Sequence, residues 1–74
     1  AIPLSQAESG EKATIAGHMG GSEIERRLND MGLNRGVEIE VLNINDGPVL
    51  ISCRGSRLAL GKGISEKILI SPVK

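Results

Sequence analysis

A short amphipathic helix is predicted by residues 23–36, which read EIERRLNDMGLNRG. Within this stretch Ile24, Leu28 and Met31 recur at helical spacing and form one apolar stripe. The charged and polar residues between them occupy the other faces. We therefore expect a helix over residues 23–31 that packs this stripe against the rest of the chain.

Both ends of this helix carry recognisable signals. Ser22 and Glu25 are three residues apart, which is the spacing of a capping box, in which each side chain bonds the other residue's backbone N–H. Gly32 follows the stripe and supplies the left-handed residue with which many helices end. Leu33 can then contact Leu28, the hydrophobic contact of a Schellman motif.

Two adjacent arginines, Arg26 and Arg27, take different positions on the predicted helix. On a helical wheel Arg27 flanks the apolar stripe, so we expect its aliphatic stem to lie along the body of the protein. Arg26 points nearly opposite to the stripe, where it is either solvated or available to a partner. The wheel thus predicts a structural role for Arg27 and makes Arg26 a candidate docking residue.

Outside the helix, short alternating segments predict β-strands, and Leu4 and Ala7 predict one short turn against the body. In the second strand the apolar phase changes near Val41, which indicates a bulge or bend. A turn is expected at 45–48, where Pro48 opens the next strand. The predicted strands cover residues 13–19, 37–44, 49–53, 57–60 and 67–71.

The last hairpin is predicted to turn at Gly55-Ser56, between Arg54 and Arg57. This register places Cys53 opposite Leu58 and Ile51 opposite Leu60, so that four apolar side chains share one face. Short strands with one helix, and at most one further helical turn at 61–66, do not form a βαβ array. We expect a mainly β domain with one or two short helices, folded as a strongly bent small barrel.

Composition narrows the functional classes. The chain has no aromatic residue, and its nine basic and nine acidic residues give a formal net charge of zero. It therefore lacks stacking platforms for bases and a global field that attracts nucleic acid or anionic lipid. Cys53 is the single cysteine, and no apolar run approaches the length of a membrane span. These features predict one domain over residues 1–74, located in the cytoplasm.

Several short motifs follow one another along the chain. They are Leu4, Gly10, Arg27-Leu28, Met31-Gly32-Leu33, Gly36, Pro48-Val49, the hairpin 54–60 and the Ile-rich strand 68–70. This ordered set resembles the ferrous iron transport protein A (FeoA) family. The resemblance implies a small SH3-like β-barrel without enzymatic activity. It also implies an accessory role, by protein–protein interaction, beside the FeoB-type membrane transporter for ferrous iron, which carries its own GTPase domain. A similar barrel forms the C-terminal domain of iron-dependent repressors.

The helix and its neighbouring turn provide the expected docking surface for the transporter. Its members are polar, charged or exposed side chains that the wheel or the adjacent glycines turn away from the core. They are Met19, Glu25, Arg26, Asn29 and Arg35. We expect no catalytic residue, because the sequence contains no nucleophile, base and carboxylate at constrained spacing.

Metal binding within one chain is not predicted, and we expect no cofactor. His18 and Cys53 are the candidate ligands, but the paired spacing typical of metal sites is absent from the sequence. Cys53 is expected in the core and His18 at the surface. A metal shared between two chains, in a self-associating barrel like those of the repressors, is one alternative function. The other is a nucleic-acid-binding barrel, with a basic strip of Arg54, Arg57, Lys62 and Lys67.

Overall fold

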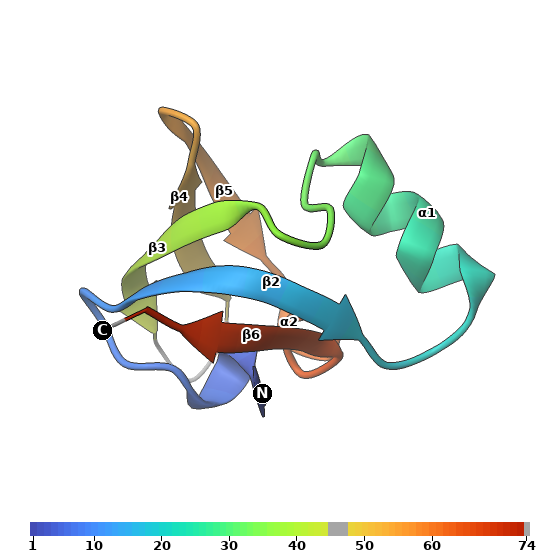
Figure 1. The fold of residues 1–74 in the computed structure, drawn as a ribbon, viewed down its shortest axis with the longest axis horizontal. Helices are drawn as coiled ribbons and strands as arrows, with labels where there is room; N and C mark the ends of the chain where they lie inside the picture. The colour runs from blue at the N-terminus through green and yellow to red at the C-terminus, as the bar shows by residue number, and fades with distance from the viewer. Residues whose placement is uncertain (45–47, 74) are drawn as a thin grey trace.

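The computed structural model describes residues 1–44 and 48–73 (Figure 1). The elements along the chain are β1 (Ile2–Pro3), η1 (Leu4–Gln6), β2 (Lys12–His18), α1 (Ser22–Asp30), β3 (Glu38–Ile44), β4 (Val49–Cys53), β5 (Ser56–Leu60), α2 (Lys62–Ser65) and β6 (Ile68–Pro72). The strands form one antiparallel six-stranded sheet in the order β1-β6-β2-β3-β4-β5.

The sheet curls strongly, so that β4 and β5 lie behind β2, β3 and β6, while α1 lies outside it at one end (Figure 1). The predicted mainly β architecture with two short helices is confirmed. One strand was missing from the prediction, because Ile2–Pro3 is too short to show alternation and ends in a proline. None of the helices in the described part of the chain has the length and apolar character needed to cross a bilayer.

Helix α1 ends as its sequence predicts. Gly32 has a φ of +76°, and its N–H donates to the carbonyl of Asn29 at 3.0 Å. The Leu33 N–H donates to the carbonyl of Leu28 at 2.8 Å, which completes the Schellman pattern. Both leucines are buried, while the other two residues of the stripe, Ile24 and Met31, are half-buried against the core.

The start of α1 differs from the prediction. Ser22 is already the first helical residue, and Gly21 is the N-cap, without a side-chain hydrogen bond. The prediction of a capping box is therefore wrong. The helix begins with a backbone hydrogen bond alone. The Glu25 N–H donates to the Gly21 carbonyl at 3.3 Å. Glu23 and Glu25 still favour this end, because carboxylates in the first turn complement the helix dipole.

The predicted irregularity in β3 is confirmed, since its register with β4 shifts between Val41 and Asn43. A second shift, in the pairing of β2 with β6, lies between Ile15 and Gly17. Pro48 precedes β4 as expected, whereas the rest of the predicted turn, residues 45–47, lies outside the described residues.

The predicted turn of the last hairpin is wrong, and the observed pairing of β4 with β5 is shifted by two residues from the predicted register. Cys53 pairs with Ser56 and Ile51 pairs with Leu58, so the two-residue loop is Arg54-Gly55. Both loop residues have positive φ, +53° and +82°, as a type I′ turn requires. Arginine rarely adopts this conformation, so nothing in the sequence marks Arg54 as a turn residue. A shift of two residues preserves the faces, so the apolar side chains still point to the core.

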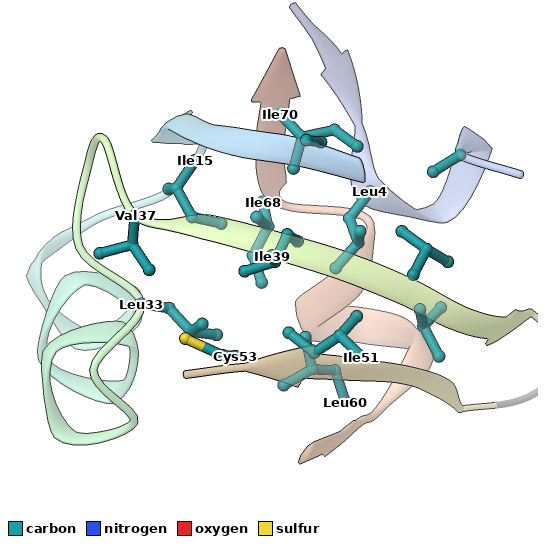
Figure 2. Packing of buried hydrophobic residues seen from close by; sticks show 14 of the residues in the cluster. Leu4, Ile15, Leu33, Val37, Ile39, Ile51, Cys53, Leu60, Ile68 and Ile70 are labelled. Atoms are coloured by element: carbon teal, nitrogen blue, oxygen red, sulfur yellow. The ribbon is translucent and has the colours of Figure 1, made fainter. Parts of the chain in front are cut away.

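The core is a single aliphatic cluster enclosed by the curled sheet, η1 and the end of α1 (Figure 2). Leu4 from the predicted N-terminal turn is fully buried, and Cys53 packs with Leu33 in the same cluster. Burial of Cys53 confirms its predicted place in the core. Since Leu33 directly follows α1, this packing fixes the end of the helix to the barrel.

Candidate functional site

A pocket of about 190 Å³ lies where α1 meets the barrel. Strand β2, helix α1 and the segment that leads from α1 to β3 all contribute to its wall. Its apolar lining consists of Ile15, Leu28 and Leu33, which are all buried members of the core. The floor is therefore held by the same contacts that hold the fold, and we call this cavity the helix pocket.

Polar side chains complete the wall of the helix pocket. Glu25 and Asn29 lie one helical turn apart on α1, so they fall on the same face of the helix. The polar lining residues are His18, Glu25, Asn29, Asn34 and Arg35. Small-molecule sites share this pattern of an apolar floor with a few polar groups, but they measure roughly 300–1,000 Å³. The smaller helix pocket therefore suits a single side chain of a partner.

His18 differs from its prediction. Its side chain was expected at the surface but is half-buried, because His18 pairs with Ile68 of β6 and lines the helix pocket. The Nδ1 atom of His18 is buried and has no hydrogen-bond partner among residues 1–44 and 48–73. Such a group carries an unmet hydrogen-bonding requirement.

Arg35 is positioned by the backbone on either side of it. The Gly36 N–H donates to the Ile15 carbonyl at 2.8 Å, and the Ile15 N–H donates to the Val37 carbonyl at 2.9 Å. These bonds fasten the segment after α1 to β2. The guanidinium then lies beside Gly17, with Nη2 at 3.8 Å from the place where a Cβ would be. Arg35 also lines a second depression, whose other lining residues are Gly36, Val37, Glu38 and Arg54.

The predicted docking residues divide into two groups. The structure brings Glu25, Asn29 and Arg35 together around the helix pocket, whereas Arg26 and Met19 are absent from its lining. Arg26 is exposed on α1, and Met19, directly after His18, is 46% exposed.

Two members of the pocket wall, His18 and Asn34, were not assigned to the docking surface by the sequence. Each lies next to a pocket-lining residue, Gly17 or Arg35, but no periodicity marks either residue. Their placement depends on the pairing of the segment after α1 with β2, which joins positions far apart in the chain.

Arg27 lies beside a different groove. This groove separates the start of α1 from α2, and its lining includes Ile24, Arg27, Ile64 and Lys67. Arg27 is exposed and lines this groove beside Ile24 of the apolar stripe, and its predicted structural role stays a prediction.

The candidate residues for metal binding and for nucleic-acid binding, the two alternative functions, do not cluster in the fold. Within the described residues no three His, Cys, Asp or Glu side chains lie close enough to hold a metal ion together. Cys53 is in the core, while His18 lines the helix pocket. The proposed basic strip is divided, because Arg54 and Arg57 lie at one end of β5, whereas Lys62 follows its other end.

The curled antiparallel sheet with α1 between β2 and β3 defines the chain as a small SH3-like barrel. A crystal structure of an iron uptake regulatory protein (FeoA) matches 97% of this chain with a TM-score of 0.91 and 34% sequence identity, and 97% of that chain is covered. The NMR structure of a FeoA-like protein from Clostridium acetobutylicum matches 99% of this chain and 87% of its own, with a TM-score of 0.87 and 29% identity.

The chain belongs to the FeoA family, since the model of the FeoA domain matches residues 2–72. A curated relative from Methanocaldococcus jannaschii, described as a putative Fe(2+) transport protein A, is 37% identical over 68 residues, which are 92% of this chain and 83% of the relative.

The predicted likeness to repressor barrels is seen at the level of the fold. The repressor ScaR with bound Cd²⁺ matches 99% of this chain with a TM-score of 0.90, but at 19% identity and over only 35% of the repressor.

Proposed function

We propose that this chain is a cytoplasmic accessory protein of ferrous iron transport that acts by docking onto the cytoplasmic region of a FeoB-type transporter. Membership of the FeoA family and the description of the curated relative as an Fe(2+) transport protein support the link to iron transport. The proposal assigns the chain no catalytic step; its contribution is binding.

One observation carries the choice of docking surface: a preformed pocket with a buried aliphatic floor and a charged rim at the junction of α1 and the barrel. Rigid core residues form the floor, so a side chain that enters the pocket gains apolar contact without ordering the protein further. Glu25 and Arg35, of opposite charge, are available to orient the partner.

Exposed residues around the pocket extend this surface. Met19 follows His18 directly and is one of two large hydrophobic residues among the described ones that are markedly exposed. Methionine is a flexible apolar side chain that is frequently used at interaction surfaces. We therefore assign docking to the helix pocket with Met19 at its margin, and we give Arg26 a lesser role than the sequence did.

The test is a pull-down of this chain against the soluble GTPase region and the full-length transporter, each without nucleotide, with GDP and with a non-hydrolysable GTP analogue. Glu25→Lys should weaken binding about tenfold, because it reverses a charge at the rim of the pocket. The neighbouring variant Arg26→Glu is the matched control, since it reverses a charge on the same helix outside the pocket, and it should change binding less than about twofold.

Three outcomes are informative. Loss of binding in Glu25→Lys alone supports the helix pocket. Loss in Arg26→Glu alone would move docking to the outer face of α1, as the wheel suggested. Failure of the unaltered chain to bind in any nucleotide state would remove the accessory-protein proposal.

A further inference from the structure

A second depression, open to solvent and about 530 Å³ in volume, adjoins the helix pocket. Arg35 and Arg54 both line it, together with Gly36, Val37 and Glu38. The two arginines come from the segment after α1 and from the tip of the β4–β5 hairpin, which only the fold brings together. We call this depression the arginine depression.

The backbone of Arg54 is strained. Its φ of +53° makes it the one non-glycine residue with positive φ in the described part of the chain. Asparagine or glycine meets this requirement of a type I′ turn at lower conformational cost. Outliers of this kind are held in place by the surrounding structure, here the two-residue turn, and they cluster at functional sites. Here the strained residue lines the same depression as Arg35.

The charge of the arginine depression favours an anion. Its lining contains two arginines and one carboxylate, that of Glu38. A further depression that Arg54 and Glu38 also line adds one lysine, Lys12, and one carboxylate, Glu40, so the excess of positive charge remains. The backbone amides of Gly36 and Val37 are already used, in bonds to the carbonyls of Ile15 at 2.8 Å and Asn34 at 3.1 Å. The donors left for a ligand are therefore the planar guanidinium forks, which match a carboxylate in two-point hydrogen bonding.

We propose that Arg35 and Arg54 bind the carboxylate of an Asp or Glu side chain in an acidic segment of a protein partner. A segment is favoured over a free anion because the depression is open and lacks a ring of backbone amides that would enclose a small ion. It also shares Arg35 with the helix pocket, so one partner can occupy both. The identity of that partner rests on the proposed function; the preference for an acidic segment does not.

The experiment is a titration of the ¹⁵N-labelled chain, at fixed salt, with a capped peptide of glutamates, a capped peptide of lysines and inorganic phosphate. The glutamate peptide should shift the signals of Gly36, Gly55 and the Arg54 side chain, and the lysine peptide should leave them unchanged. Equal or tighter binding of inorganic phosphate to the same residues would assign the depression to small anions and overturn the acidic-segment proposal.

Two variants separate this site from general charge attraction. Arg54→Asn creates the Asn-Gly pair that type I′ turns favour, so it should raise Tm by a few degrees while weakening the peptide about fivefold. Arg57→Asn removes an exposed arginine of the same hairpin that is absent from the lining, and it should change affinity less than about twofold. Equal weakening in both variants, or none in Arg54→Asn, would overturn the proposal.

The outcome is independent of the transporter. If the pull-down fails while the glutamate peptide binds, the proposed function falls and the acidic-segment site stands. If the transporter binds and Arg54→Asn leaves the affinity for the glutamate peptide unchanged, the proposed function stands and the acidic-segment site falls.

Discussion

The end of α1 and the tip of the β4–β5 hairpin require the same backbone conformation and meet the requirement differently. At the helix end Gly32 takes the left-handed conformation with a φ of +76°. At the hairpin tip Arg54 takes it with a φ of +53°, next to Gly55. Glycine adopts this conformation without a Cβ penalty, whereas arginine does not. The comparison suggests that Gly32 serves the fold and that Arg54 serves binding.

The largest expected effect is on the helix end. Leu33→Ala should lower the free energy of unfolding by about 2–5 kcal/mol, because Leu33 is 1% exposed and joins the end of α1 to the core. Denaturation in urea measures it. Met31→Ala, at the half-buried C-cap of α1, is the control and should cost clearly less. Equal losses would show that Leu33 has no special role.

The next effect tests the glycine itself. Gly32→Ala should cost about 1–2 kcal/mol, although no atom lies within 4 Å of the added Cβ, because the penalty is conformational. Gly63→Ala is the matched control, since it is equally unobstructed, lies within α2 and lacks positive φ. It should stabilise the chain by about 0.4–1 kcal/mol. Thermal unfolding compares them, and effects of the same sign would contradict this explanation.

At the hairpin tip the sign should reverse. Arg54→Asn should raise the free energy of unfolding by about 1 kcal/mol, because asparagine occupies left-handed conformations more readily than arginine. Urea denaturation of this variant and of Arg57→Asn separates relief of strain from removal of charge. A destabilised Arg54→Asn would mean that Arg54 serves the fold, and the contrast with Gly32 would disappear.

The smallest effect concerns the start of α1. Ser22→Ala should change the free energy of unfolding by less than about 0.5 kcal/mol, because the Ser22 side chain makes no capping hydrogen bond. A capping box would instead predict a loss of about 1 kcal/mol. A loss of that size in urea denaturation would restore the interpretation that the structure overturned.

Sequence reasoning succeeded where local rules decide the structure. The apolar stripe of α1, its end at Gly32 and the bulge near Val41 each depend on residues that are close in the chain. It failed at Ser22 and at Arg54, where the chain departs from the commonest local solution. No propensity scale predicts an arginine with positive φ, and the two-residue error in the hairpin register follows directly from that exception.

The candidate site was predicted only in part for a different reason. The wheel placed Glu25 and Asn29 on accessible positions of α1, and the structure places both beside the helix pocket. The sequence did not predict that His18 or Arg54 would line a pocket, because the other lining residues come from distant strands and loops. Pockets formed by distant segments leave no periodic signal in the sequence, whereas helix faces do.

The most direct test of the central claim is a map of backbone amide shifts in the ¹⁵N-labelled chain on addition of the transporter's soluble GTPase region. We expect the largest changes at His18, Asn29 and Arg35, around the helix pocket, with smaller changes at the hairpin tip. Changes confined to β5, or to the outer face of α1 around Arg26, would contradict docking through the helix pocket.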